Sequence, residues 1–285
     1  MNDINTDLEK SLFTDVANAL AEDIGSGDLT AALVPAGQQA RATLVSRDDT
    51  VICGIPWFDM VFAELSTEIE IEWLVTEGDI ISANSTLCEL SGPADALLTG
   101  ERTAMNFLQT LSGTATTARK FVDAVAATDT VILDTRKTLP GLRLAQKYAV
   151  RTGGAQNHRT GLYDGILIKE NHIVACGGID GAVKAALQQN NSVLIEVEVE
   201  SLDEARAAIN AGAQRLLLDN LSLNDMRAAV LLRNELNQQV GLEASGNVTL
   251  STVHDIASTG VDFISIGLLT KDVHAIDLSM RFEML

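Results

Sequence analysis

The sequence predicts an α/β protein whose second half is a parallel βα barrel. From about residue 130 onward, apolar strand-like stretches alternate with helical stretches at the spacing typical of repeated strand–helix units. Six strands are expected, beginning near Val131, Gly165, Val193, Arg215, Gly241 and Asp262. Polar residues directly follow these strands, and the carboxyl ends of all strands meet at one rim of a barrel. A doubly wound sheet is the alternative, but it gives no reason for polar residues at every strand end.

Residues 1 to about 127 show a different pattern, which predicts a small sheet carrying helices. We expect helices over Leu8–Glu22, Ala94–Leu111 and Ala115–Ala127, and strands over Ala40–Ser46 and Glu68–Trp73. In the second of these strands glutamates alternate with Ile69, Ile71 and Trp73. Strict alternation is typical of a sheet with one buried and one solvated face.

The composition disfavours two classes of partner. The 285 residues include 20 Lys and Arg against 39 Asp and Glu, a formal net charge of −19. Such acidity repels phosphate backbones and anionic lipids, so we expect neither nucleic acid nor a membrane as a partner. Cys53, Cys88 and Cys176 form no CxxC pair, which argues against a zinc site or a disulfide framework. Neither a signal peptide nor a membrane-spanning run is recognisable, so a cytoplasmic location is predicted.

Positive charge is concentrated in one segment, from Asp134 to His172. It holds seven of the 20 Lys and Arg, where an even distribution would place about three. The seven are Arg136, Lys137, Arg143, Lys147, Arg151, Arg159 and Lys169. Arg143, Lys147 and Arg151 are spaced by four, which fits a solvated helical face. Arg136, Lys137 and Lys169 follow strands, where a charge needs a partner, so the segment predicts a multiply charged anionic ligand.

Two glycine-containing strand ends indicate where a phosphate would bind. Ser245-Gly246-Asn247 leads into a helix, whose free backbone N–H groups suit an oxyanion. Gly267 ends the next strand and would allow close approach of a ligand. Barrels often bind phosphate after their last two strands.

The carboxylates of the third and fourth barrel strands indicate a cation or a ribose. Glu196, Glu198 and Glu200 share one strand face, so Lys169 and a divalent ion such as Mg²⁺ would be needed to neutralise them. For Glu198 and Asp219 we favour binding of the metal or of ribose. A simple salt bridge between Lys169 and a glutamate is the alternative.

Longer motifs carry a family resemblance over nearly the whole chain. The run DTRKTLPGLRLAQKYAVRTGGAQNHRTGLYDGILIKENH, followed by EVEVES, LLLDN, EASGNV and ISIG, resembles the quinolinate phosphoribosyltransferase family, the nicotinate-nucleotide pyrophosphorylases. GSGDLT and ERTAMNFLQTLSGTAT resemble its N-terminal half. The resemblance implies an N-terminal α/β sandwich over residues 1–112 and an incomplete, open (β/α) barrel over 113–270. Residues 271–285 are expected to pack back on the first domain.

The resemblance also implies a reaction and a set of site residues. The reaction is decarboxylating transfer of phosphoribose from phosphoribosyl pyrophosphate to quinolinate, giving nicotinate mononucleotide, pyrophosphate and CO₂ in NAD biosynthesis. The enzyme would be a homodimeric pentosyltransferase that uses Mg²⁺ and no organic cofactor, with Lys137, Lys169, Glu198 and Asp219 as its catalytic residues. The implied quinolinate site comprises Arg136, His158, Arg159, Lys169 and, from the second subunit, Arg102. The implied phosphoribosyl pyrophosphate site comprises Lys137, His172, Glu198, Asp219, Ser245, Gly246, Asn247 and Gly267, with Glu198 and Asp219 as the Mg²⁺ ligands.

Other functions remain open on the residues alone. Lys169 at a strand end could form a Schiff base, as in barrel aldolases. A related phosphoribosyltransferase could act on another heterocycle, although Arg102, Arg136 and Arg159 together favour a dicarboxylate. A non-catalytic phosphate binder would not need both the arginines and the acidic pair.

Overall fold

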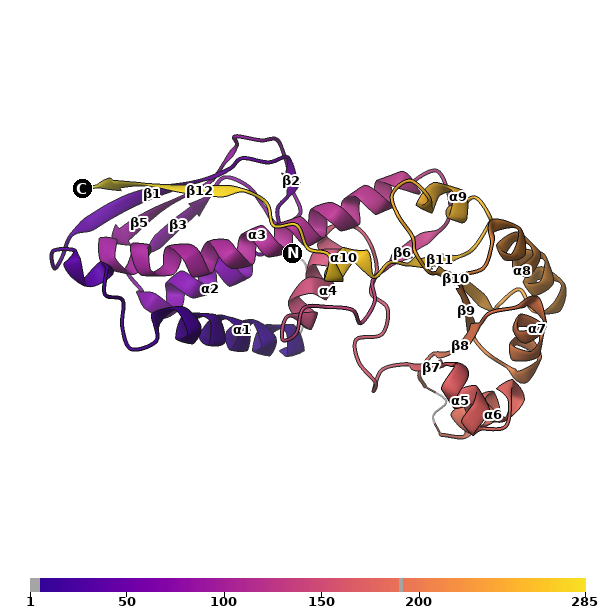
Figure 1. Cartoon of the computed structure of the whole chain (residues 1–285). Helices are drawn as coiled ribbons and strands as arrows, with labels where there is room; N and C mark the ends of the chain where they lie inside the picture. Colours follow the sequence, from indigo (N-terminus) through magenta and orange to yellow (C-terminus); the bar gives the residue numbers. More distant parts are fainter. Residues whose placement is uncertain (1–5, 190–191) are drawn as a thin grey trace. The chain divides into compact units, whose positions relative to one another are not determined.

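The computed structural model describes residues 6–189 and 192–285, which form two compact units (Figure 1). The first unit takes residues up to Arg119, Thr138–Gly154 and Leu269–Leu285; the second takes Lys120–Lys137 and Ala155–Leu268. The first unit extends past residue 112 because one helix continues through that position, and it includes a later helix; the division into domains at residue 112 stays a prediction.

An antiparallel sheet of four strands, in the order β12-β1-β5-β3, forms the frame of the first unit. The strands are β1 (Gln39–Ser46), β3 (Glu70–Trp73), β5 (Thr86–Pro93) and β12 (Leu278–Met284), and β2 (Thr50–Val51) pairs separately with β4 (Ile80–Ile81). The C-terminal strand β12 pairs with β1, Leu44 facing Met280. In β3 the glutamates are exposed while Ile71 and Trp73 are half-buried, which confirms the alternation.

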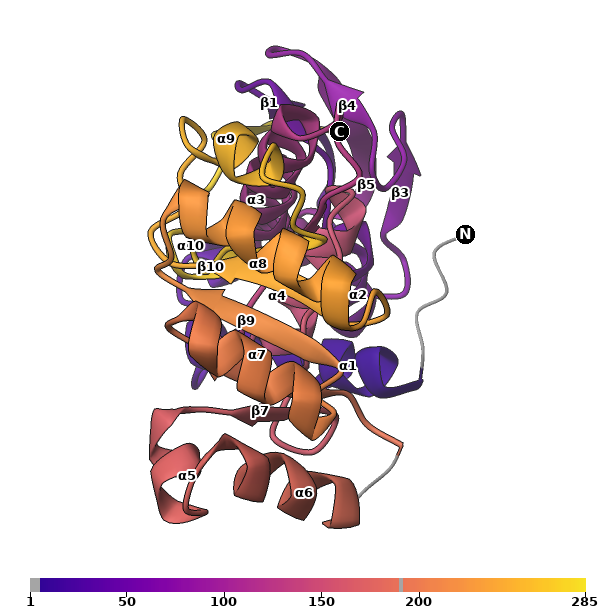
Figure 2. The same ribbon diagram turned by 90° about the vertical axis from the view of Figure 1, so that its right-hand side faces the viewer.

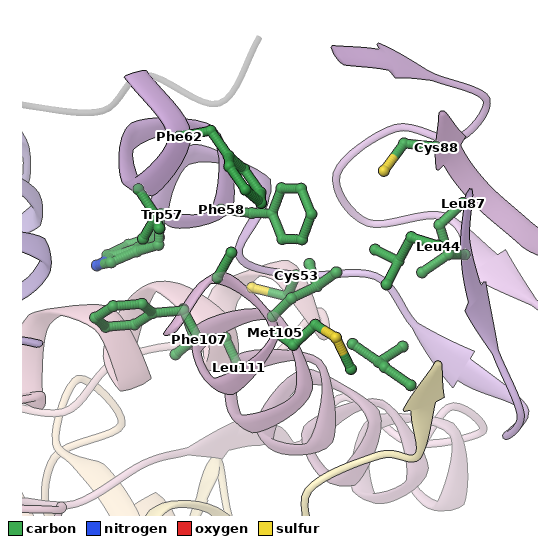
Figure 3. Packing of buried hydrophobic residues seen from close by; sticks show 14 of the residues in the cluster. Leu44, Cys53, Trp57, Phe58, Phe62, Leu87, Cys88, Met105, Phe107 and Leu111 are labelled. Carbon is green, nitrogen blue, oxygen red and sulfur yellow. The ribbon is translucent and has the colours of Figure 1, made fainter. Parts of the chain in front are cut away.

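Within the described residues, five α-helices and one 3₁₀ turn accompany this sheet. They are α1 (Thr6–Ile24), η1 (Ala31–Leu33), α2 (Ile55–Leu65), α3 (Ala94–Ala124), α4 (Arg143–Thr152) and α10 (Leu268–Lys271). The core gathers the scarce aromatic side chains on α2, where Trp57, Phe58 and Phe62 are almost fully buried (Figure 3). Trp57 lies 5.4 Å from Tyr148 of α4 between ring centroids, so α4 belongs to this core.

Where two helices were expected over residues 94–127, the single helix α3 spans Ala94–Ala124. Gly113 interrupts the sequence pattern but not the helix, because its missing side chain makes room for another segment. A β-carbon at Gly113 would overlap the carbonyl oxygen of His274. The glycine therefore allows close packing of the C-terminal segment on α3 and does not mark a helix end.

Gly113→Ala is expected to lower the free energy of unfolding by about 1–3 kcal/mol, the usual cost of overpacking against atoms that cannot move away. Urea denaturation measures it. Asn106→Ala, on an exposed position of the same helix, should change the value by less than about 0.5 kcal/mol. Equal stabilities of the two variants would contradict the close approach of α3 and His274.

A parallel sheet of six strands, in the order β6-β11-β10-β9-β8-β7, forms the second unit. The strands are β6 (Val131–Leu133), β7 (Ile166–Ile168), β8 (Ile195–Val199), β9 (Arg215–Asp219), β10 (Gly241–Ser245) and β11 (Phe263–Ser265). Among the described residues β6 and β7 lie at the two edges and do not pair, so the barrel is open. The α/β fold class and the parallel second half are as predicted.

The helices of the second unit lie on one face of its sheet, as in a barrel and not as in a doubly wound fold (Figure 1). They are α5 (Glu170–Ala175), α6 (Ile179–Gln189), α7 (Leu202–Ala211), α8 (Leu223–Leu236) and α9 (Val253–Ala257). Figure 2 shows α6, α7 and α8 side by side on the face toward the viewer. Among the residues that the structure describes, no helix is both long and apolar enough to cross a membrane.

Candidate active site

The two faces of the parallel sheet differ sharply in chemistry, because successive side chains of a strand point to opposite faces. The face under the helices is apolar and fully buried, with Val197, Val199, Leu216, Leu218, Leu242, Ala244 and Ile264. The opposite face carries Glu196, Glu198, Arg215, Asp219, Glu243 and Ser245, placed together by the pairing of Glu196 with Arg215 and of Ser245 with Asp219. Functional groups are therefore collected on the face without helices.

Asp134 joins the basic loop after β6 to the loop that carries His158. Its side chain is fully buried and accepts the backbone N–H of His158 at 2.8 Å and the side-chain amide of Asn157 at 2.7 Å. Arg136 and Arg159 come close enough that burial and the positive charge of Arg136 together lower the pKa of Arg159. Two guanidinium groups placed this way repel each other, and a bound carboxylate would relieve that repulsion.

Lys137 and Gly267 meet, although 129 positions separate them in the chain. A β-carbon at Gly267 would lie 3.0 Å from Cδ of Lys137, so the lysine side chain runs along the glycine backbone. Lys137 is an exposed residue. The loops after β6 and β11 thus bring a cation close to the main chain at Gly267.

The ends of β9 and β10 form a locked pair of turns with unusual backbone angles. Asn220 and Asn247 have φ of 53° and 47°, and Gly246 has φ of 111°. Asn220 donates its backbone N–H to Ser245 O at 2.9 Å and its side-chain amide to Oδ2 of Asp219 at 2.9 Å. A β-carbon at Gly246 would overlap Oδ1 of Asn220. Non-glycine residues with positive φ are uncommon and cluster at functional sites.

Lys169 and Glu198 form an ion pair across the ends of β7 and β8. The distance from Nζ to Oε2 is 2.8 Å, and the side chains are 51% and 16% exposed. Nδ1 of His172 accepts the backbone N–H of Lys169 at 3.0 Å, which fixes the start of α5. Glu200, by contrast, is exposed, and its backbone N–H donates to Glu204. Glu198 and Glu196 therefore have different partners, Lys169 and His158, while Glu200 is exposed.

A buried ionic cluster lies deeper on the same face, and part of it was missed by sequence reasoning. Nε2 of His158 lies 2.8 Å from Oε2 of Glu196 and 3.4 Å from Oε2 of Glu243. Arg215 places Nη1 3.2 Å from Oε2 of Glu243 and its guanidinium carbon 3.9 Å from the Phe263 ring centroid. Glu243 and Arg215 were not predicted as site residues, yet strand alternation places Glu243 on the face of Ser245.

The protonation of this cluster is set by two opposing influences on His158. Burial lowers its pKa, but the hydrogen bonds to Glu196 and Glu243 and their negative charges outweigh burial and raise the pKa, which favours a proton on Nε2. The backbone N–H of Arg159, however, donates to Nδ1 of His158 at 2.8 Å, which requires a lone pair on that nitrogen. A second ring proton would have to break this bond, so the geometry corresponds to the neutral form protonated at Nε2.

The helix α4 corrects one sequence interpretation. Arg143, Lys147 and Arg151 were expected on a solvated helical face, but Lys147 is only 1% exposed. Arg143 is half-buried and donates from Nε to Thr138 at 3.1 Å, and only Arg151 is exposed. The spacing of four was read correctly as one helical side, but that side is not the solvated one.

The remaining expected site residue, Arg102, lies in the other unit. It is exposed on α3. The other twelve expected residues lie in the second unit, most of them at or just after the carboxyl ends of its strands, with His172 in α5 and with His158 and Arg159 in the loop before β7. An open parallel barrel with arginines, lysines and a glycine turn at this edge defines an enzyme class that binds anionic substrates.

Comparison with known proteins identifies the family. Residues 28–112 match the N-terminal domain, and residues 114–281 the C-terminal domain, of quinolinate phosphoribosyl transferase. The chain is 42% identical to a probable nicotinate-nucleotide pyrophosphorylase [carboxylating] of Synechocystis, covering 92% of this chain and 89% of the relative. A mitochondrial quinolinate phosphoribosyltransferase [decarboxylating] of Nicotiana tabacum is 40% identical, over 93% and 80%.

A solved structure shows the same similarity. The nicotinate-nucleotide pyrophosphorylase of Francisella tularensis superposes with a TM-score of 0.94 at 44% identity, covering 99% of this chain and 100% of that one. The chain belongs to the quinolinate phosphoribosyltransferase family. It is therefore a pentosyltransferase, as the resemblance implied.

Proposed function

We propose that this chain transfers phosphoribose from phosphoribosyl pyrophosphate to quinolinate, with loss of the 2-carboxylate as CO₂, in NAD biosynthesis. The observation that carries the proposal is that cationic side chains and glycine turns lie together near the carboxyl ends of the parallel strands. Arg136, Arg159 and Lys169 supply cations for a dicarboxylate. The turn at Gly246, packed against Asn220, and the backbone at Gly267, beside Lys137, would bind a phosphate.

Quinolinate would bind at the cationic end of this edge. Its two carboxylates suit the planar fork of a guanidinium, which donates two parallel hydrogen bonds. Arg136 and Arg159 provide two such forks, and Lys169, directly after β7, provides a point charge. His158 lies behind Arg159, with both ring nitrogens bonded within the protein.

Phosphoribosyl pyrophosphate would bind along the loops after β9, β10 and β11. Ser245, Gly246 and Asn247 would hold its 5-phosphate with Gly267, while Lys137 and His172 would face the pyrophosphate. Glu198 and Asp219 would bind the ribose hydroxyls. Asn220 supports this role, because its amide holds the Asp219 carboxylate at 2.9 Å.

The reaction follows from this placement by positioning and electrostatics. The ring nitrogen of quinolinate attacks the anomeric carbon, and the bond from that carbon to pyrophosphate breaks with its electrons leaving on oxygen. Lys137 stabilises the departing charge, and Glu198 stabilises positive charge on the ribose. The ring nitrogen is now cationic, so the ring holds the electron pair left when the 2-carboxylate departs as CO₂, and a proton then takes its place.

Mg²⁺ fits the donor set of Glu198 and Asp219. Both offer carboxylate oxygens, the ligands that this ion prefers, at the ends of neighbouring strands. Neither belongs to a cluster of three or more ligand groups within the described part of the chain. That suits an ion held mainly by substrate oxygens and water. When bound, Mg²⁺ would neutralise charge on the pyrophosphate.

We further propose a homodimer in which Arg102 of one copy completes the quinolinate site of the other. Arg102 is exposed on α3 and so is available to a partner. Arg102→Ala and Lys169→Met are each expected to be inactive alone. When the two variants are mixed in equal amounts and exchange subunits, half of the sites lie in mixed dimers, and one of the two sites of each mixed dimer has both wild-type residues. The mixture should therefore regain about a quarter of the wild-type activity. No recovery in a mixture proven to exchange subunits would contradict the shared site.

The function is tested by supplying purified protein with phosphoribosyl pyrophosphate, Mg²⁺ and either quinolinate or nicotinate. We expect nicotinate mononucleotide to form when quinolinate is supplied but not when nicotinate is supplied. Nicotinate has a single carboxylate and would leave one guanidinium fork unfilled. Equal turnover of nicotinate would favour the related transferase acting on another heterocycle. Borohydride trapping of a carbonyl substrate on Lys169 would instead favour the aldolase reading.

Gly246→Ala is expected to raise the KM for phosphoribosyl pyrophosphate at least about tenfold, since the methyl group would displace Asn220 and strain the turn. Gly260→Ala is the matched control, because Gly260 also has positive φ, 91°, but a β-carbon there meets only Val230 at 3.6 Å. The control should lose stability without a change in KM. Steady-state kinetics of both variants measure the KM for phosphoribosyl pyrophosphate. An unchanged KM in Gly246→Ala would show that this turn is not part of the phosphate site.

A further inference from the structure

The imidazole of His158 is held on both sides by protein groups. Nδ1 accepts the backbone N–H of Arg159 at 2.8 Å, and Nε2 lies 2.8 Å from Oε2 of Glu196. Only 9% of the His158 side chain is exposed. A ring with both nitrogens bonded in this way has one orientation and one tautomer, with the proton on Nε2.

The groups behind His158 are costly to bury, and the reaction itself does not use them. Glu196 and Glu243 are 1% and 0% exposed, and one oxygen of each, Oε1, has no hydrogen-bond partner among the described residues. A buried carboxylate without full hydrogen bonding reduces stability. Such a pair needs a role that compensates for this cost.

Metal binding is one role that these three groups could have. His158, Glu196 and Glu243 bring ligand atoms within 4.8 Å of one another. The guanidinium of Arg215, however, already lies 3.2 Å from the same oxygen of Glu243 that faces His158. A divalent cation there would be repelled by Arg215 and would displace the Nε2–H of His158 from Glu196. The geometry favours a hydrogen-bonded support over an ion site.

The segment that this support reaches is the one that carries Arg159. Arg159 donates from Nη1 to Gly165 O at 3.1 Å, and Asp164 accepts the backbone N–H groups of Thr160 and Gly161 at 2.7 and 2.8 Å. The loop is thus fixed at its far end by Asp164 and at its near end by the ring of His158. Rotation of that ring would release the backbone of Arg159.

We propose that Glu196, supported by Glu243 and Arg215, is a positioning residue for quinolinate: it holds His158 in the Nε2–H form and thereby fixes Arg159. This inference rests on the proposed function, in which Arg159 binds a carboxylate of quinolinate. Positioning of this kind acts on the affinity for one substrate, because the phosphate turns lie on other loops.

Two variants at one position separate the loss of the acceptor from the loss of charge. In Glu196→Gln the amide oxygen still accepts the Nε2–H, so the KM for quinolinate should stay within about threefold of wild type. In Glu196→Leu the close acceptor is lost, and only Oε2 of Glu243 remains, 3.4 Å from Nε2 and already paired with Arg215. The KM for quinolinate should therefore rise about tenfold or more. The Kd of phosphoribosyl pyrophosphate should change less than about twofold in both.

Val197→Ala is the matched structural control. Val197 is the next residue of β8 and is fully buried on the opposite, apolar face. It should lower the Tm while leaving the ratio of the two substrate constants unchanged. A quinolinate-selective defect in this control, or equal defects in the Gln and Leu variants, would overturn the proposal.

The tautomer is read directly by ¹⁵N–¹H correlation spectroscopy of protein labelled at histidine, with His158 assigned from His158→Gln. We expect a neutral ring protonated at Nε2 in the wild type and loss of that form in Glu196→Leu. A ring protonated at Nδ1 in the wild type would overturn the proposal even if the Leu variant failed to fold. A wild-type enzyme that does not convert quinolinate would contradict the proposed function, whereas the tautomer measurement stands apart from it.

Discussion

Replacing Arg136 with alanine is expected to weaken quinolinate binding by about 100-fold or more, while the affinity for phosphoribosyl pyrophosphate changes less than about threefold. The reason is that a charge-assisted bidentate contact disappears and a ligand carboxylate stays desolvated without a partner. In the proposed site Arg136 would face this ligand together with Arg159, whose pKa is lowered by burial and by the charge of Arg136. Titration calorimetry with each substrate measures the effect.

Arg151→Ala tests whether position or mere positive charge matters. Arg151 lies in the same basic segment but is exposed on α4, with its guanidinium 5.9 Å from the Tyr148 ring centroid. Its removal should change quinolinate affinity by less than about threefold. If both variants lost affinity equally, the segment would act as a diffuse field, and Arg136 would have no specific place in the site.

Replacing Lys169 with methionine is expected to lower kcat by about 10²–10³-fold, the usual effect of removing one preorganised charge from a site. Methionine keeps much of the apolar stem and removes only the ammonium group. In the wild type this group lies 2.8 Å from Oε2 of Glu198, so the variant also leaves that carboxylate without its cation. Single-turnover kinetics of product formation report the loss in the chemical step.

Lys184→Met is the control for this change. Lys184 forms an ion pair with Asp180 at 2.8 Å on α6, and both side chains are more than 60% exposed. Exposed pairs of this kind contribute about 0–1 kcal/mol, so activity and stability should hardly change. Lys169→Arg should not restore activity, because a planar fork does not replace a compact point charge. Full activity of Lys169→Arg would remove the need for a lysine.

The fold was largely predictable because its local and global patterns agree. The six expected strand positions all correspond to strands of the parallel sheet, and polar residues such as Asp219 and Ser245 do end them. The alternation of glutamates with apolar residues predicted β3, because this pattern can be recognised without knowing the partner strand. The continuity of α3 through Gly113 was missed, since the reason for that glycine is a segment some 160 residues later.

The deeper part of the site was less predictable for a related reason. The sequence predicted Lys169 and a divalent ion as the counter-charges of Glu196, whereas its partner is His158 from a loop. Glu243 could have been found, because it precedes Ser245 by two and must share its strand face. The burial of Lys147 could not be predicted, because helical spacing identifies one side of the helix but not which segment packs on it.

The central claim is tested most directly with quinolinate carrying ¹⁴C in its 2-carboxylate. Incubated with wild-type protein, phosphoribosyl pyrophosphate and Mg²⁺, it should release labelled CO₂ and give unlabelled nicotinate mononucleotide in equal amounts. Without phosphoribosyl pyrophosphate no CO₂ should appear, because only the ribosylated, cationic ring can hold the electron pair left by the carboxylate. Label retained in the nucleotide, or no CO₂ release by active, folded protein, would contradict the account.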